Sequence, residues 1–287
     1  MEIISNVEAL RQHLRPARIS GLSIALVPTM GNLHQGHMNL VHQAILENDI
    51  VVASIFVNPL QFGPDEDLLA YPKTLDQDIE KLRSAGCHVL FSPSREEIYG
   101  EDSGAQSMVH VPEITARFCG KSRPGHFDGV ATVVTKLFNL VLPQRAYFGL
   151  KDYQQVLVIE QLVKDLNFDI EIKRVDIARD SKGLALSSRN NYLDNAELEY
   201  AAALQQTISK TAQSITTGNR DFSLLENEAR NLLEANHFSV DYFAICNAEN
   251  LEAATQSDSQ LVILAAAYIG KHKTRLIDNM RVNLTAD

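Results

Sequence analysis

The sequence predicts an α/β fold, with a Rossmann-like parallel sheet domain followed by a smaller C-terminal α+β domain. Uniformly apolar runs at residues 24–27 and 51–57 are typical of strands buried on both faces. Between them, apolar residues recur at helical spacing, which makes a strand–helix–strand unit and therefore a parallel sheet. Beyond Tyr192 the expected helices come before the expected strands, so we expect domains at residues 1–177 and 178–287.

Composition limits the class of protein further. The 287 residues are 45% hydrophobic and 22% charged, which is ordinary for a globular chain of one large or two modest domains. A net charge of −10 disfavours binding along a nucleic-acid backbone, yet local basic side chains can still hold one nucleotide. The three cysteines lack C-x-x-C spacing, and no apolar run approaches the ~18 residues that span a bilayer. We therefore expect a cytoplasmic protein with reduced thiols, no metal-ligand set, and neither a nucleic-acid nor a membrane partner.

The segment 27–37 (VPTMGNLHQGH) is the expected nucleotide site. Pro28 should end the first buried strand, and two glycines bracket the loop that leads into a helix. His34 and His37 are three residues apart and should share one face of the first helical turn. Backbone N–H groups and the helix dipole favour phosphate at such a junction. A histidine near a helix start is often only a surface or capping residue, so the pair alone leaves the function open.

The next elements are a short helix at 7–14, a helix at 75–85 and a strand at 88–91. The strand at 51–57 ends in NPLQFG (58–63), for which an ordinary Pro/Gly turn is the favoured interpretation when the segment is taken alone. A group of carboxylates could meet Mg²⁺, although a solvated charged face is the favoured interpretation. These carboxylates are Asp65, Glu66, Asp67, Asp76 and Asp78. Residues 108–111 alternate like an edge strand, and we expect this strand to pair across a dimer axis.

Three later segments carry polar groups that suit anions. Residues 123–129 (RPGHFDG) precede an apolar helix at 130–142, where Arg123 suits an anion and His126 a structural role. A strand at 145–148 runs into 149–155 (GLKDYQQ) before a helix that continues through 166. A strand at 169–177 is followed by 183–190 (GLALSSRN), whose hydroxyls and arginine could neutralise a polyphosphate. Lysine pairs and serine turns are also common on surfaces without any function.

The remaining chain should form helices at 196–217 and 222–236 and strands at 241–245, 261–269 and 276–282. No repeat or catalytic motif occurs there.

Residues 34–37 (HQGH) resemble the His-x-Gly-His signature of a nucleotidyltransferase superfamily. Residues 28–37, 149–155 and 187–190 together resemble the pantothenate synthetase family, also called pantoate–β-alanine ligases. The resemblance implies an acid–amine ligase in which ATP and pantoate give pantoyl adenylate and pyrophosphate, after which β-alanine gives pantothenate and AMP. It also implies Mg²⁺ as a cofactor with no assigned ligands, a homodimer, and a lid role for the second domain.

The resemblance assigns residues to roles as well. The catalytic group is His34, His37 and Lys151. The ATP-binding group is Met30, Gly31, Asn32, Leu33, His34, Gln35, Gly36, His37, Gly149, Leu150, Lys151, Asp152, Ala178, Leu186, Ser187, Ser188 and Arg189. The group for pantoate and β-alanine is Asn58, Gln61, Tyr71, Arg123 and Gln155. Leu150 departs from relatives with an acidic residue or glutamine, a change that a turn acting through its backbone N–H groups should tolerate.

Two rival functions remain open at this point. Another nucleotidyltransferase could use the same histidine pair on a phosphate acceptor, and release of AMP would distinguish the two. A nucleotide-sensing module without turnover is the second rival. Donors aimed at a leaving pyrophosphate argue against a sensor, which has no use for them.

Overall fold

The computed structural model describes residues 1–64, 66–101 and 106–284, and the chain divides into two compact units. We call Met1–Leu150 with Val158–Asp176 the sheet unit. Lys151–Leu157 with Ile177–Asp287 form the C-terminal unit. Helix α7 (Tyr153–Asp165) contributes its first residues to the C-terminal unit and the rest to the sheet unit.

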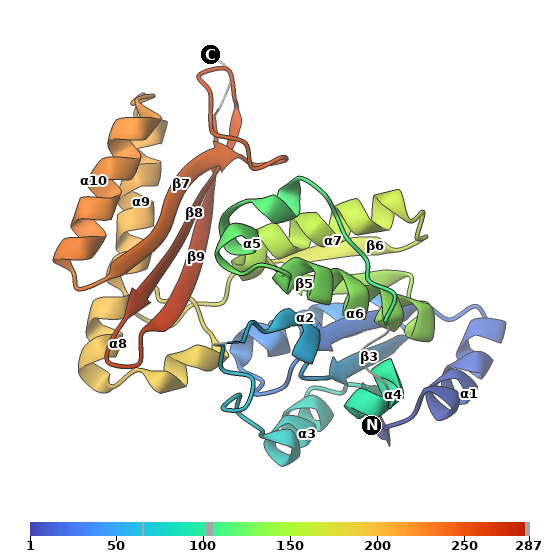
Figure 1. Cartoon of the computed structure of the whole chain (residues 1–287). Helices are drawn as coiled ribbons and strands as arrows, with labels where there is room; N and C mark the ends of the chain where they lie inside the picture. The colour runs from blue at the N-terminus through green and yellow to red at the C-terminus, as the bar shows by residue number, and fades with distance from the viewer. Residues whose placement is uncertain (65, 102–105, 285–287) are drawn as a thin grey trace. The chain divides into compact units, whose positions relative to one another are not determined.

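Among the described residues of the sheet unit, six strands form one parallel sheet in the order β1-β4-β3-β2-β5-β6 (Figure 1). The strands are β1 (Glu2–Ile4), β2 (Ile24–Thr29), β3 (Ile50–Ile55), β4 (Val89–Phe91), β5 (Arg145–Gly149) and β6 (Glu171–Val175). Strand β2 lies between β3 on one side and β5 on the other, so the direction in which strands are added reverses after β4. Ligands bind outside the carboxyl ends of the strands at such a reversal of strand order.

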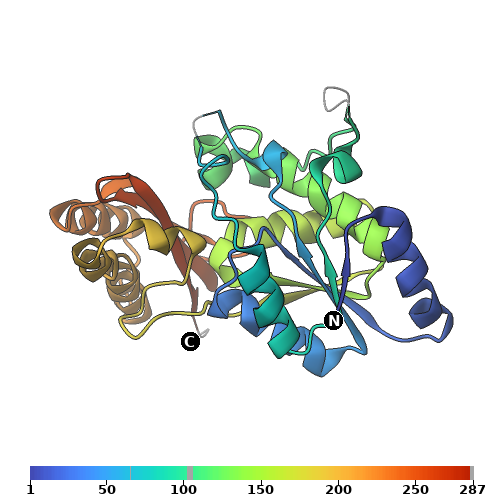
Figure 2. The ribbon, with the colours of Figure 1, turned by 90° about the horizontal axis from the view of Figure 1, so that it is seen from below.

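Helices cover both faces of this sheet, as the view along it shows (Figure 2). Helix α2 (Gln35–Glu47) packs against α3 (Leu75–Ser84), and α1 (Val7–Ile19) packs against α6 (His126–Val141). Shorter helices connect the larger elements. They are η1 (Pro59–Gln61), α4 (Arg95–Tyr99), η2 (Ile114–Ala116), α5 (Phe118–Ser122) and η3 (Leu150–Asp152).

Strand β2 continues beyond Pro28, so the expectation that this proline ends the strand is wrong. Pro28 pairs in register with Ser54, and Thr29 with Ile55. On its other side β2 pairs with β5 only through Ala25 and Leu26. The missing N–H of Pro28 therefore falls where β5 no longer pairs, and the strand tolerates it.

Residues 108–111 form no strand within the described part of this single chain, and their expected pairing across a dimer axis stays a prediction. The backbone N–H of Val109 instead donates to Thr132 Oγ1 on α6 at 2.9 Å, and Val111 is buried. Within the chain, the apolar alternation therefore coincides with packing of this segment on α6.

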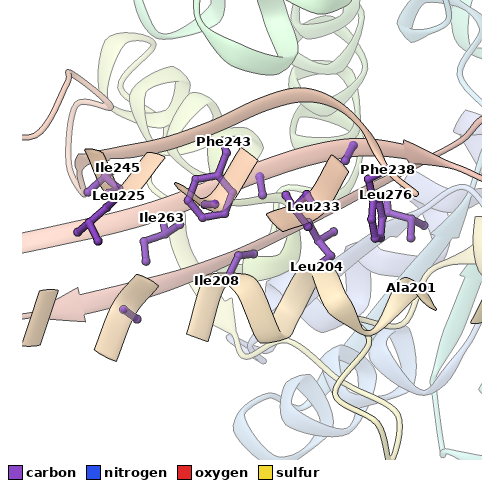
Figure 3. Packing of buried hydrophobic residues seen from close by; sticks show 14 of the residues in the cluster. Ala201, Leu204, Ile208, Leu225, Leu233, Phe238, Phe243, Ile245, Ile263 and Leu276 are labelled. Atoms are coloured by element: carbon purple, nitrogen blue, oxygen red, sulfur yellow. The ribbon is translucent and has the colours of Figure 1, made fainter. Parts of the chain in front are cut away.

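The C-terminal unit contains an antiparallel sheet in the order β7-β8-β9, the only sheet among its described residues. Its strands are β7 (Ser239–Asn247), β8 (Gln260–Ile269) and β9 (Thr274–Asn283). Helices α9 (Ala203–Thr216) and α10 (Phe222–Ala235) cover one face, where Ile208, Leu233 and Phe243 lie in a common core (Figure 3). The expected helix 196–217 is divided at Ala202 into α8 (Asn195–Ala201) and α9. The remaining element is η4 (Ser188–Tyr192).

The predicted fold class, an α/β sheet domain with a smaller C-terminal α+β domain, is confirmed by these two sheets. No helix among the described residues is long and apolar enough to cross a membrane. All three cysteines are described and buried, and none forms a disulfide.

Candidate active site

The loop between β2 and α2 has an unusual backbone. Gly31 and Asn32 both have positive φ angles, of 83° and 49°. Glycine takes this conformation at no steric cost, and asparagine tolerates it better than most residues. Thr29 Oγ1 donates to the carbonyl of Ser54 at 2.8 Å and accepts from the N–H of Gly31 at 3.2 Å. These contacts fold the chain tightly between the end of the strand and the start of the helix.

The two histidines lie side by side at the start of α2, with ring centroids 4.1 Å apart. His34 is the N-cap, and its Nδ1 accepts from the N–H of Gly36 at 3.1 Å. His37 Nδ1 accepts from the N–H of His34 at 3.2 Å. In a neutral imidazole, a nitrogen that accepts must leave the proton on the other nitrogen. Both rings are therefore held as the Nε2–H tautomer, which is a hydrogen-bond donor at Nε2.

Gln61 ends the turn η1, which follows β3, and its neighbours hold that turn closely. Asn58 is buried, and its Nδ2 donates to the carbonyl of Gly129 at 3.0 Å and to Gln61 Oε1 at 3.2 Å. The hydroxyl of Tyr99 donates to Asn58 Oδ1 at 2.7 Å. Burial raises the pKa of the Tyr99 phenol, so it remains a donor at neutral pH. The Asn58 amide thus fixes the turn to α6.

The loops that follow β2 and β3 meet at the side chain of Gln61. Its Nε2 lies 2.9 Å from the sulfur of Met30. Phe62, the next residue, packs edge-on against Tyr71, with ring centroids 5.9 Å apart, and Tyr71 is buried. The amide of Gln61 therefore lies beside apolar groups, where an additional hydrogen bond gains strength from the low local dielectric.

Arg123 is engaged by neighbouring protein groups. Its Nε and Nη2 donate to the two carboxylate oxygens of Glu66 at 2.6 Å each, and its Nη1 donates to His126 Nε2 at 3.0 Å. The other nitrogen of His126, Nδ1, then donates to the carbonyl of Gln61 at 2.8 Å. Burial acts to raise the pKa of Glu66, but hydrogen bonds and charge from Arg123 outweigh it and hold that pKa below its usual value. The arginine and His126 thereby support the Gln61 turn.

The segment after β5 divides between the two units. Gly149 and Leu150 belong to the sheet unit, while Lys151, Asp152 and Gln155 belong to the C-terminal unit. Within the C-terminal unit, the carbonyl of Lys151 accepts from Asn279 Nδ2 on β9 at 2.9 Å. Tyr153 donates its hydroxyl to the carbonyl of Ala248 at 2.9 Å. Strand β9 and the loop after β7 therefore fix the backbone around Lys151.

The loop 178–190 is built by local backbone bonds. The N–H of Leu186 donates to the carbonyl of Ala178 at 2.9 Å, and Asp180 Oδ1 accepts from the N–H groups of Lys182 and Leu184. Ser187 is the N-cap of η4, and its Oγ accepts from the N–H of Arg189 at 3.3 Å. Residue 178 and residues 186 to 189 therefore belong to the same hydrogen-bonded loop of the C-terminal unit.

A second contact anchors this loop to β9. Arg179 Nη1 donates to Asp278 Oδ2 at 2.6 Å, and its Nη2 donates to Oδ1 at 2.9 Å. Asp278 is buried, so the bidentate pair lies largely away from water, where such pairs impose strong geometry. Sequence reasoning missed Arg179, Asp278 and Asn279. Arg179 and Asp278 are 99 positions apart, and Asn279 is 128 positions from Lys151, so no local spacing signals these contacts.

Two of the five acidic residues considered for Mg²⁺, Asp78 and Glu66, have protein partners. Asp78 accepts from two backbone N–H groups, and Glu66 pairs with Arg123. Of the others, Asp76 is exposed, Asp67 is half-buried and Asp65 lies outside the described residues. Among the residues that the structure describes, no group of three or more His, Cys, Asp or Glu side chains could hold a metal ion. These side chains therefore do not fit a protein-built magnesium cage.

A parallel sheet whose central strand leads through a tight loop to two histidines at a helix start defines an α/β protein with a site suited to an anionic ligand at the strand end. Comparison with known proteins narrows this class. The sequence profile of the family described as pantoate-beta-alanine ligase matches residues 2–281. The chain belongs to the pantoate–β-alanine ligase family.

Individual relatives agree with this assignment over nearly their full length. The pantothenate synthetase of Pseudomonas savastanoi pv. phaseolicola is 51% identical, over 98% of this chain and 99% of the relative. The pantothenate synthetase crystal structure from Thermus thermophilus is 42% identical with a TM-score of 0.91, covering 98% and 99% of the two chains. The Francisella tularensis pantoate-beta-alanine ligase, crystallised with beta-gamma ATP and beta-alanine, is 38% identical with a TM-score of 0.80, covering 98% and 97%.

Proposed function

We propose that this chain condenses pantoate with β-alanine at the expense of ATP and releases pantothenate, AMP and pyrophosphate. The observation that carries the proposal is the family match over residues 2–281. The Francisella tularensis relative, crystallised with beta-gamma ATP and beta-alanine, supports these two substrates for this chain too. In the first step, a carboxylate oxygen of pantoate attacks the α-phosphorus of ATP and pyrophosphate leaves. In the second step, the amine of β-alanine attacks the acyl carbon of pantoyl adenylate and AMP leaves.

The first step brings an anionic carboxylate to an anionic phosphate, so catalysis must offset charge that builds on phosphate oxygens. The Nε2–H donors of His34 and His37, fixed by their own backbone contacts, suit that task. Preorganised donors of this kind act without reorganising during the reaction. We assign Lys151, Ser187, Ser188 and Arg189 to the other phosphate oxygens, with residues 30–37, 149–152, Ala178 and Leu186 completing the nucleotide site. No covalent protein intermediate is needed.

For pantoate, we propose that Gln61 and Gln155 bind the hydroxyls and the carboxylate. A neutral amide offers both a donor and an acceptor, so it can bind a carboxylate without the tight ion pair that would weaken the nucleophile. Met30 provides an apolar neighbour to Gln61. Asn58, Tyr71 and Arg123 then serve pantoate and β-alanine through the turn whose position their contacts fix.

Three further properties belong to the proposal. Magnesium would arrive on the phosphates of ATP, which is common for this ion. A cytoplasmic location is supported by the three buried cysteines, which form no disulfide. A homodimer is supported by the exposed side chain of Met108 in an extended segment that pairs with no strand among the described residues. Sedimentation of the purified chain tests the dimer.

The reaction is tested by product analysis with purified protein, ATP, Mg²⁺, pantoate and β-alanine. We expect pantothenate, AMP and pyrophosphate in equal amounts, and none of them when pantoate is left out. Formation of ADP, or of a nucleotidylated acceptor without AMP, would contradict the proposal. ATP binding with no turnover of any kind would indicate a sensor instead.

A further inference from the structure

Helix α3 follows strand β3, yet it contacts the loop between β2 and α2. We call this loop, which ends at His34, the histidine loop. Asp78 on α3 is fully buried. Its Oδ2 accepts from the N–H of Asn32 and its Oδ1 from the N–H of Leu33, each at 2.8 Å. Thr74 Oγ1 also donates to Oδ2, at 3.0 Å. A buried carboxylate is costly unless donors surround it, and here two of its three donors belong to the loop that carries His34.

Lys81 reaches the same loop from the next turn of α3. Its ammonium donates to the carbonyl of Leu33 at 2.6 Å. Residues three apart on a helix lie on one face, so Asp78 and Lys81 act side by side. Together they bind both the N–H and the C=O of Leu33, whose next residue is His34. We call these two side chains the α3 clamp.

The loop needs such support because of its backbone. Gly31 and Asn32 are consecutive residues in the left-handed region, which ordinary residues avoid. A side-chain carbon added at Gly31 would lie 3.3 Å from Asp78 Oδ2 and 3.1 Å from Ile55 Cγ2, so Asp78 packs closely against this turn. A left-handed pair persists only where the surroundings determine it.

The clamp leads directly to the histidine rings. The N–H of His34, immediately after Leu33, donates to His37 Nδ1, and His34 Nδ1 in turn accepts from Gly36. A shift of Leu33 would therefore move the backbone group that sets the tautomer of His37, together with the ring of His34.

We propose that Asp78 and Lys81 are positioning residues that hold the paired imidazoles in place for adenylate formation. The proposal rests on the proposed function and adds two residues that act through the loop. Asn in place of Asp78 keeps the shape but offers one acceptor and an NH₂ group to two N–H donors. One loop N–H then faces another donor, and the turn must shift.

The test compares Asp78→Asn and Lys81→Met with Glu80→Gln. The last variant is the matched control, because Glu80 is an exposed acidic residue on the same helix. Pyrophosphate exchange gives the kcat and the KM for ATP and for pantoate, ATP affinity is measured alone, and circular dichroism reports the folded fraction. For Asp78→Asn we expect an exchange kcat about 10²-fold lower, the loss typical of a misplaced catalytic group, with an unchanged pantoate KM. In Lys81→Met the exchange kcat should fall about tenfold, which corresponds to the loss of one charge-assisted hydrogen bond. Lys81→Arg should restore most of that kcat.

Normal exchange kcat in both Asp78→Asn and Lys81→Met would overturn the proposal. A fall in kcat that only matches the fall in folded fraction would also overturn it. So would a fall in kcat accompanied by an equal rise in the pantoate KM, because either pattern indicates general structural support. If Asp78→Asn does not fold, the Lys81→Met and Lys81→Arg pair decides by the same criteria. If wild type and Glu80→Gln both fail to exchange pyrophosphate, the proposed function is wrong. The role of the α3 clamp is then tested by ATP affinity alone: lower affinity in Asp78→Asn than in wild type would support it, and equal affinity would overturn it.

Discussion

His34 and His37 differ from ordinary capping histidines in their mutual arrangement. Each Nδ1 is used by a backbone N–H, so each ring presents Nε2 as its donor. We expect His34→Ala and His37→Ala to retain the fold and to lower the adenylation kcat by about 10²–10³-fold, the usual loss for one preorganised donor. Single-turnover formation of pantoyl adenylate measures this.

His42→Ala is the matched control, because His42 is an exposed histidine on the same helix, and it should keep wild-type rates. Near-normal adenylation in either His34→Ala or His37→Ala would move the chemistry to another group.

Gln61 and Gln155 should determine the selection of pantoate. Loss of either amide would leave polar substrate groups without partners, at about 1–3 kcal/mol each, which is roughly 5- to 150-fold in affinity. Gln61→Ala and Gln155→Ala should therefore raise the pantoate KM while ATP affinity, measured alone, stays unchanged. Gln161→Ala, on the same helix as Gln155, serves as control. Loss of ATP affinity ahead of pantoate affinity would show that the glutamines bind the other substrate.

Among contacts between single residues, the sequence predicted those between residues that lie close together along the chain. The spacing of His34 and His37 predicted neighbouring rings because a helix places residues three apart on one face. The same reasoning could not find Asp78, which lies 46 positions from Asn32. Asp78 stood in the sequence only as one of several carboxylates, since its partners are backbone groups that carry no residue-specific signal.

Gly129 determines how closely helix α6 approaches the turn η1. A side-chain carbon at this position would lie 2.2 Å from the carbonyl oxygen of Leu60, the residue before Gln61. Gly129→Ala must therefore push η1 away and break the contact between Asn58 and the helix. We expect a loss of about 1–3 kcal/mol in the free energy of unfolding, as for overpacking in cores, and a raised pantoate KM.

Chemical denaturation and steady-state kinetics measure these two effects. Asn139→Ala, an exposed change on α6, is the control. Wild-type stability together with wild-type pantoate KM in Gly129→Ala would contradict the close packing of η1 on α6.

The pair of Glu66 and Arg123 joins the loop after η1 to the segment before α6, and it should make stability depend on acid. The pKa of Glu66 is held below its ordinary value of 4.5. The pair therefore contributes fully above pH 4.5, and its contribution is lost as the pH falls through the lowered pKa of the folded state.

Urea unfolding as a function of pH tests this directly. Glu66→Gln should be less stable than wild type at neutral pH, and the difference should shrink below pH 4.5. Glu228→Gln, which changes an exposed residue in the middle of α10, should follow the wild type throughout. A difference that stays constant with pH would show that the pair contributes no charge-dependent stability.

Elements were predictable where local pattern decides structure. The buried runs of β2, β3 and β8 read as strands because their residues are apolar without interruption. Strand β1 was missed because its three residues carry too little pattern. The alternation at 108–111 also reflects packing against α6, because Val111 is buried and Val109 contacts Thr132 while Met108 is exposed. The division between α8 and α9 falls at Ala202, without a glycine or proline to signal it.

At the scale of the whole chain, the strand-to-helix junctions predicted a parallel sheet, which is confirmed, and the observed strand order places the histidine loop after a central strand. The division into units was less accessible from sequence. Residues 151–157 cluster with the C-terminal unit although they follow β5 in the chain. Their assignment depends on contacts with distant residues such as Asn279 and Ala248, which hydrophobic periodicity does not report.

We infer that pantoate is activated as an adenylate before β-alanine reacts. Exchange of labelled pyrophosphate into ATP measures this step alone, because only a reversible adenylation returns label to ATP. We predict exchange that requires pantoate and Mg²⁺ and proceeds without β-alanine. Exchange that is independent of pantoate, or that appears only when β-alanine is added, would contradict this order of steps.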